Sequence, residues 1–132
     1  MNWDLVLAGF AADLAATAEI MAAVGDAVYQ GGEVPHRVPS VVIRMIGDAE
    51  SELWAPVTLQ VDIFHKSFTT VRALENIVRR RYHAPLPIPI GGLNCWAQFT
   101  GGSSTTLPER DGYTGRALRF TFTPLRAAYT GG

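Results

Sequence analysis

The chain has 132 residues, of which 48% are hydrophobic and 17% charged, and its formal net charge is −1. This length predicts one domain with a sizeable core, and the small net charge disfavours partners attracted by a strong overall field, such as nucleic acid or an anionic membrane. Charged residues are scarcer than the roughly 25% usual in globular domains. This composition favours an oligomer over a compact monomer with a surface rich in glycine and alanine.

The single cysteine, Cys95, cannot form an internal disulfide, and no metal-ligand spacing surrounds it. No run of about 18 apolar residues is present, so we expect no membrane-spanning helix. Asp4 and Asp13 interrupt the apolar N-terminal stretch, and no basic segment precedes it, unlike a secretion signal. We therefore expect the protein to fold in a cytoplasm.

Residues 3–24 are predicted to form the first helix, with Asn2 as a candidate N-cap and Gly25 placed to end it. The opposite side of this helix is rich in alanine, which reflects either helix propensity alone or the close approach of a neighbouring subunit. The predicted buried stripe, at three-to-four spacing, consists of Trp3, Leu7, Phe10, Leu14, Thr17, Met21 and Val24.

Two strands are predicted next. Residues 27–30 suit a short extended piece, and a loop with Pro35 and Pro39 leads to a strand over 41–46. An acidic turn, G-D-A-E-S-E at 47–52, then connects to a long strand over 53–64. The short connection predicts that the two long strands pair as an antiparallel hairpin.

Residues 57–82 hold the clearest pattern, and the rest of the chain is organised around it. Apolar residues alternate from Val57 to Ile63, which indicates a half-buried strand. The period then changes to that of a helix, whose stripe is Val71, Leu74, Val78 and Tyr82. Ser67 is a good N-cap for this helix.

The remaining chain is predicted to give two strands and much irregular structure. Three prolines in residues 83–92 favour an extended segment along a sheet edge or across a neighbour, with a proline-rich ligand as the alternative. Strands are expected over 93–99 and 115–123, with Leu118, Phe120 and Phe122 facing inward. A flexible loop is expected over 100–114 and a loose tail over 125–132.

The predicted order is therefore α-β-β-α-β-β in a single domain over residues 1–132. This is an α+β fold with a mainly antiparallel sheet of about four strands and two helices on one face.

Asp62, His65 and Ser67 are residue types found in nucleophilic sites, but their spacing disfavours catalysis. Asp62 lies on a strand, His65 leaves it, and Ser67 is needed as a cap. The three histidines are not spaced as ligands, and Gly101–Gly102 lacks the lysine of a phosphate loop. These patterns disfavour a nucleophilic site, a metal site and a phosphate loop, and they leave a small-ligand enzyme as the least favoured class.

Charged clusters are the candidate interaction sites. The arginines at 79–81 complement the negative end of a helix dipole, or else contact acidic protein or DNA. The acidic turn is either solvated or meets those arginines in the next subunit, and the tryptophan beside it fits an interface anchor or a core residue. The candidate interface residues are Asp48, Glu50, Glu52, Trp54, Arg79, Arg80, Arg81, Glu109, Arg110 and Asp111.

Several stretches together resemble the tail terminator proteins, also called tail-completion or minor tail proteins, of long-tailed bacteriophages and related gene transfer agents. The first helix runs into V-G-D-A-V-Y at 24–29, and a proline-bearing loop leads to V-P-S-V-V-I at 38–43. After the acidic turn come V-T-L-Q-V-D-I-F, the helix start S-F-T-T-V-R-A-L, and the last strand R-A-L-R-F-T-F. The proline-rich segment and the 100–114 stretch match no motif of the family.

The resemblance implies a virion protein that assembles in the host cytoplasm, with no enzymatic activity, no cofactor and no small-molecule substrate. It implies a six-membered ring of this chain that caps the head-proximal end of the tail tube, ends tube polymerisation and joins the tail to the head connector. The implied partners are other copies of the chain, the tail tube protein and the head-completion or connector protein, with DNA passing passively through the lumen. Two alternatives remain at this stage: a head-closure protein, and a nucleic-acid-binding module that uses Arg79–Arg81 and Tyr82.

Overall fold

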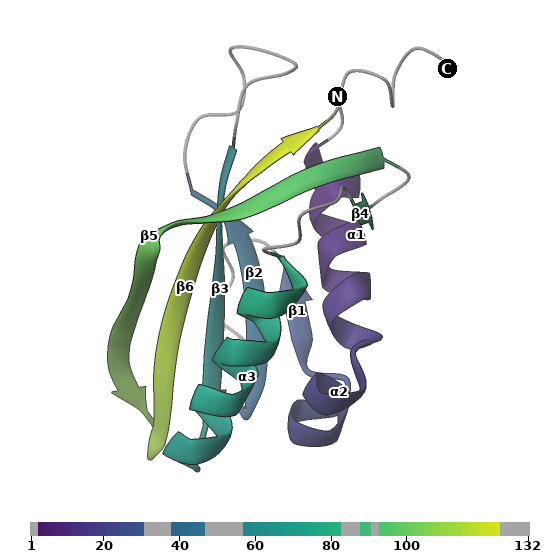
Figure 1. Cartoon of the computed structure of the whole chain (residues 1–132). Coiled ribbons are helices and arrows are strands. Elements are labelled where there is room, and N and C mark those ends of the chain that lie inside the picture. Colours follow the sequence, from purple (N-terminus) through teal and green to yellow (C-terminus); the bar gives the residue numbers. More distant parts are fainter. Residues whose placement is uncertain (1–2, 31–37, 47–56, 83–87, 91–92, 125–132) are drawn as a thin grey trace.

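The computed structural model describes residues 3–30, 38–46, 57–82, 88–90 and 93–124. Three helices and six strands occur in these ranges (Figure 1). In chain order they are α1 (Trp3–Ala15), α2 (Ala18–Val24), β1 (Val28–Gln30), β2 (Ser40–Met45), β3 (Val57–His65), α3 (Phe68–Arg81), β4 (Ile88–Ile90), β5 (Leu93–Arg110) and β6 (Tyr113–Pro124).

The strands form one sheet in the order β1-β2-β3-β6-β5-β4. All neighbouring strands are antiparallel except β1 and β2, which are parallel. The predicted α+β class, the mainly antiparallel sheet and the β2–β3 hairpin are confirmed. The sheet has six strands rather than four because β1 and β4, with three residues each, add short strands at its two margins.

The predicted single helix over 3–24 is wrong, because the chain bends by 83° between α1 and α2. Thr17 is extended, with φ −77° and ψ 118°, and its hydroxyl donates a 3.0 Å hydrogen bond to the carbonyl oxygen of Asp13. Such a bond to the carbonyl four residues earlier bends helices. The break shifts the buried face: Ile20 is 1% exposed and Met21 is 53% exposed, the reverse of the predicted stripe.

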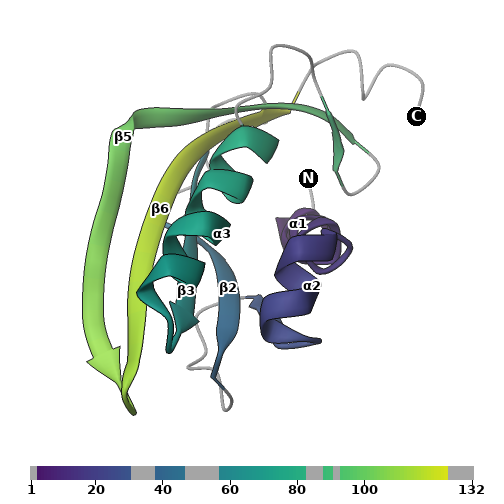
Figure 2. The same ribbon diagram turned by 60° about the horizontal axis from the view of Figure 1, so that its bottom comes forward.

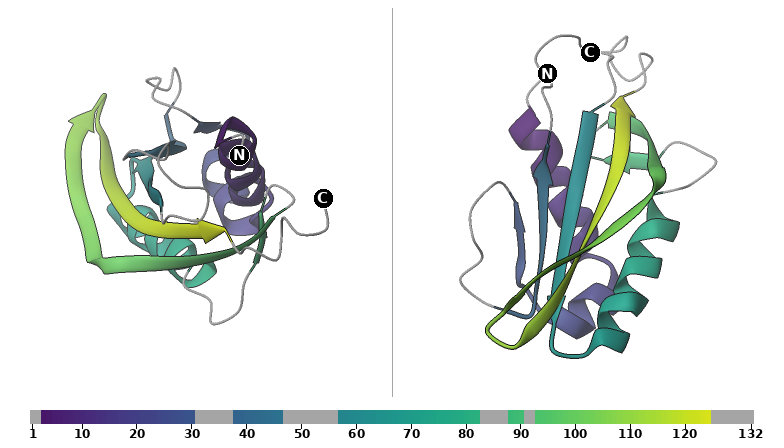
Figure 3. Two further views of the ribbon diagram at one scale, coloured as in Figure 1. Left: turned by 90° about the horizontal axis from the view of Figure 1, so that it is seen from above. Right: turned by 90° about the vertical axis from the view of Figure 1, so that its left-hand side faces the viewer.

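The sheet is strongly curved, and all three helices lie on its concave face (Figures 2 and 3). The two edge strands β1 and β4 both contact α1, whereas β3 and β6 contact α3. The core fills the space between. Its largest fully buried side chains include Tyr82, Phe10, Phe120, Leu14, Ile20, Ile43, Leu59, Ile63, Leu118 and Val41.

The predicted change from strand to helix near Ser67 is confirmed. The hydroxyl of Ser67 accepts a hydrogen bond from the backbone N–H of Thr70, at 3.2 Å, and so caps α3. The predicted stripe of α3 is buried, as are Leu118 and Phe120 of β6. Periodicity predicted these positions because residues on one face recur every three to four positions in a helix and every two in a strand.

Part of the proline-rich segment is described, and it lies at a sheet edge as predicted. Ile88–Ile90 forms β4, which pairs only with Leu93–Cys95 of β5. Pro89 is tolerated there because an edge strand can leave one side of its backbone unpaired. Residues 83–87, 91–92 and the predicted tail at 125–132 lie outside the described residues.

The predicted irregular loop over 100–114 is wrong. β5 continues to Arg110 and pairs with β6, and the chain reverses at Asp111 and Gly112. Both turn residues have positive φ, at 51° and 82°, as two-residue hairpins require. A register shift between Phe99 and Ser104 marks a bulge, and bulges bend strands. The glycines at 101 and 102 therefore belong to a bent strand, whose corner is visible in Figure 3.

Within the described ranges, no single helix is long and apolar enough to cross a membrane. The bent pair of α1 and α2 passes that test only when the two helices are taken together, by length and composition.

Candidate functional site

The three arginines at the end of α3 lie in different environments, and Arg81 is bound within the chain. The Nε of Arg81 donates a 3.0 Å hydrogen bond to Oδ2 of Asp13 in α1, and its Nη2 donates to Oδ1 of the same carboxylate. The Tyr82 hydroxyl donates a 2.7 Å hydrogen bond to Oδ2. Arg81, predicted as an interface residue, is therefore occupied within its own chain, where it joins α3 to α1.

The partners of Asp13 lower the pKa of its carboxyl. Partial burial by itself raises the pKa of its carboxyl, but the hydrogen bonds from Arg81 and Tyr82 and the charge of Arg81 outweigh burial. The pKa of Asp13 therefore lies below its ordinary value of 3.8. Burial, followed by the hydrogen bond to Asp13, raises the pKa of Tyr82, so its hydroxyl stays protonated.

The other two arginines differ in exposure. Arg80 is exposed and Arg79 is half-buried. The predicted partners Asp48, Glu50 and Glu52, together with Trp54, lie outside the described residues. The predicted pairing of this cluster with that acidic turn in another chain stays a prediction for Arg79 and Arg80.

The predicted charged group at 109–111 lies at the tip of the β5–β6 hairpin. Glu109 and Asp111 are exposed, and Arg110 pairs through its backbone with Tyr113 as the last residue of β5. Exposure at a hairpin tip is compatible with contact to another protein. It does not arrange the three residues as a catalytic or ligand-binding site.

Asp62, His65 and Ser67, whose spacing disfavours catalysis, each make other contacts. The hydroxyl of Ser67 caps α3, and its backbone N–H, not its hydroxyl, donates a 3.0 Å hydrogen bond to Nδ1 of His65. Asp62 lies on the convex face and is bound by Arg44 at 2.8 Å. A nucleophile needs its hydroxyl on the base, and this arrangement does not provide that contact.

The convex face carries a polar network that the sequence interpretation missed. Nε of Arg119 in β6 donates to Oε1 of Gln60 at 2.9 Å, and Nε2 of Gln60 donates to Oδ1 of Asp62 at 2.7 Å. Arg44 of β2 completes it through its ion pair with Asp62. Burial raises the pKa of Asp62, and the hydrogen bond from Gln60 and the two arginines offset only part of that rise. Alternation placed Gln60 and Asp62 on this face, but only the strand register brings the two arginines beside them.

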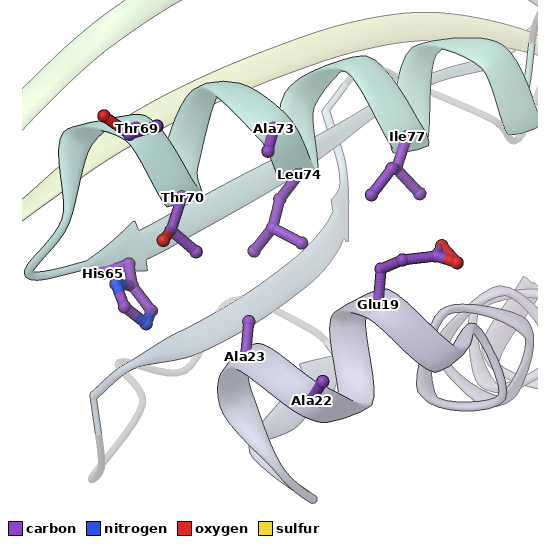
Figure 4. Close-up of a pocket in the computed structure, with 9 residues that line it drawn as sticks. All are labelled: Glu19, Ala22, Ala23, His65, Thr69, Thr70, Ala73, Leu74 and Ile77. Carbon is purple, nitrogen blue, oxygen red and sulfur yellow. The ribbon is translucent and has the colours of Figure 1, made fainter.

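A groove of about 470 Å³ lies between α2 and α3 (Figure 4). Its walls are mostly alanine and aliphatic side chains, with Glu19 and His65 also at its margin. The exposed Met21 and Phe68 belong to the same two helices. This lining suits apolar contact, and it explains part of the predicted alanine face, because Ala22 and Ala23 lie in the groove. The other lining residues are Thr69, Thr70, Ala73, Leu74 and Ile77.

Among the described residues, no group of three or more histidine, cysteine, aspartate or glutamate side chains is arranged to hold a metal ion. The surfaces that this part of the chain offers include a charged helix end, a hairpin tip and an apolar groove, whereas Gln60 and Asp62 of the convex-face network are buried. The three surfaces are suited to contact with other macromolecules.

No protein-family model and no curated protein sequence matches the chain. A solved structure does match, and it is titled "Virion of native gene transfer agent (GTA) particle". The alignment covers 90% of this chain and 93% of the matched chain, with a TM-score of 0.57 and 18% sequence identity. The fold is shared with a chain of a gene transfer agent particle. At that identity the likeness is one of fold, and it extends over nearly the whole of both chains.

Proposed function

We propose that this chain is a non-enzymatic structural protein of a phage-like virion or gene transfer agent particle. The observation that carries the proposal is the fold match over almost the full length of both chains. A partial match could reflect a common supersecondary motif, whereas this one covers 90% of this chain. The low share of charged residues, 17%, also suits a subunit whose surface is partly covered in an assembly.

Within the particle, the role we propose is the tail terminator: a ring, six-membered by resemblance, at the head-proximal end of the tail tube. The ring stops tube growth and receives the head connector, and DNA passes through its lumen. Subunits of a ring contact their neighbours through two different surfaces. Exposed Arg80 and the hairpin tip with Glu109 and Asp111 lie on different elements, and they are candidates for such surfaces.

The nucleic-acid-binding alternative loses support from the ion pair at the helix end. One arginine of the cluster, Arg81, is neutralised by Asp13. Phosphate recognition depends on clustered cations that are available to the backbone of the nucleic acid. The net charge of −1 gives no long-range attraction in its place.

Localisation in purified particles tests the proposal. The protein carries a small C-terminal epitope tag, and a gold-labelled antibody is imaged on negatively stained particles. We expect label at the junction of head and tail. Label along the tube, at the distal tip, or absence of the protein from purified particles would contradict the terminator role.

A further inference from the structure

β5 has a long outer edge with no partner strand in the described part of the chain. β4 covers only Leu93–Cys95 of it, although β5 runs to Arg110. The other side of β5 pairs with β6 along most of its length. Among the described residues, no strand pairs with the outer edge from residue 96 onward, and the backbone N–H and C=O groups along such an edge are suited to pairing with another strand.

The part of this edge best formed for pairing is the stretch S-T-T-L at residues 104–107. Its four residues pair with Leu118, Ala117, Arg116 and Gly115 of β6 in unbroken register. It contains no charge and no proline, and its threonines favour the extended conformation. Thr105 and Thr106 are exposed.

Both flanks of this stretch carry features that prevent strand pairing. On one side, the register shift between Phe99 and Ser104 marks a bulge. On the other side, Pro108 cannot donate a ladder hydrogen bond, and exposed Glu109 adds charge. Bulges, prolines and charges are the devices by which sheet edges avoid unwanted pairing. Here they leave one short stretch available and restrict the register in which a strand can dock.

We infer that residues 104–107 of β5 bind an extended segment of a second copy of this chain by strand addition. Backbone hydrogen bonds would supply the contact, and the flanking bulge and proline would set its register. The choice of a second copy rests on the proposed function, because a ring requires contacts between copies. Since ring contacts are head-to-tail, the docked segment is not β5 itself.

Site-specific photo-crosslinking tests this inference in cells that produce the particles. p-Benzoylphenylalanine replaces Thr105, which lies on the convex side of the edge, and the crosslinked peptides are identified by mass spectrometry. We expect a ladder of covalent oligomers in which residue 105 is joined to a peptide of this chain outside residues 93–110. Crosslinks to another protein, crosslinks to residues 93–110 of a second copy, or no crosslink would each overturn the inference.

Two adjacent proline variants provide a matched control. Successive residues of a strand direct their N–H groups to opposite sides, so Thr105→Pro and Thr106→Pro remove amides from different sides of β5. The variant that breaks the β5–β6 ladder should lower Tm. The other should keep the parental Tm and abolish the crosslink ladder, which is read with the photo-crosslinker at whichever of residues 105 and 106 is not proline and is compared with the same probe in the parent. If the variant with parental Tm keeps the full ladder, strand addition at this edge is wrong.

This test can fail independently of the proposed function. A terminator without strand addition would still give gold label at the junction of head and tail, but no ladder from residue 105. A different role in the particle would give label elsewhere, whatever the crosslink result.

Discussion

The hydroxyl of Tyr82 donates a 2.7 Å hydrogen bond to Asp13. The two residues are 69 positions apart, and the bond joins the end of α3 to α1. The Tyr82 ring itself lies in the core, stacked on Phe120 at 5.0 Å between ring centroids. One aromatic residue thus packs the two helices onto the sheet and fixes how α1 sits against α3.

Loss of this link should destabilise the fold. Asp13→Ala leaves the buried Tyr82 hydroxyl without its acceptor, which should lower the free energy of unfolding by about 1–3 kcal/mol. Tyr82→Phe removes donor and hydroxyl together and should cost about 0.5–1.5 kcal/mol. Urea unfolding of the two variants and the double variant measures the coupling. If Asp13→Ala lowers the free energy of unfolding equally in the parent and in the Tyr82→Phe protein, the hydrogen bond between Asp13 and the Tyr82 hydroxyl does not contribute to stability.

The stabilisation by Asp13 should depend on pH with a defined sign. Its pKa is lowered in the folded state, so the contribution is complete above the ordinary value of 3.8 and is lost as pH falls through the lower folded pKa. The deficit of Asp13→Asn relative to the parent should therefore shrink in acid. Asp62 is the opposite control: its pKa is raised, so Asp62→Asn should gain relative to the parent as pH rises through 3.8. Urea titrations across this range check both signs, and a deficit for Asp13→Asn that grows in acid would contradict the account.

Gly115 should tolerate no larger side chain. A Cβ at this position would lie 2.5 Å from Cε1 of Phe64 and 3.2 Å from Cβ of Leu107. Gly115→Ala should therefore lower the free energy of unfolding by about 1–3 kcal/mol. The same change in a Phe64→Ala background should cost less, because the ring that it meets is gone. Thermal unfolding of the four proteins tests this, and additive costs would rule out the predicted clash.

Substitutions of two arginines at the end of α3 should affect assembly and stability differently. Arg80→Glu changes an exposed residue and should impair ring formation while leaving Tm unchanged. Arg81→Glu replaces the ion pair with Asp13 by two negative charges and should lower Tm. If the acidic turn of the neighbouring subunit is the partner, adding Glu50→Lys and Glu52→Lys should restore assembly of the Arg80→Glu protein. Tails completed by Arg80→Glu as efficiently as by the parent would exclude the contact.

Periodic elements were predictable from the sequence, and contacts between elements were not. The strand over 57–65 and the helix capped by Ser67 followed from alternation, spacing and a known cap. The break at Thr17 did not, because it lies in an alanine-rich run that favours a continuous helix. The dipeptide Asp111–Gly112 was a hairpin signal in the sequence, but the polar composition of residues 100–110 obscured it.

The interaction surfaces could be predicted only in part. The cluster of three arginines is visible in the sequence, but the sequence does not show that Arg81 is bound within its own chain. Arg81 is paired because α1 and α3 lie on the same face of the sheet, which brings Asp13 to it from 68 positions away. The network of Arg44, Asp62, Gln60 and Arg119 likewise depends on strand order and register, which sequence periodicity does not specify. Such long-range pairings require the folded chain.

The terminator role is tested most directly by tail length. The gene is deleted in the producing strain, and the tubes and tails released on lysis are measured by electron microscopy, with a complemented strain as control. The account predicts free heads together with tubes of uncontrolled length, many longer than the parental tail, and restoration of uniform joined tails by the complementing gene. Unjoined tails of uniform parental length would indicate a head-closure protein instead, and normal joined particles would contradict any role in completing the tail.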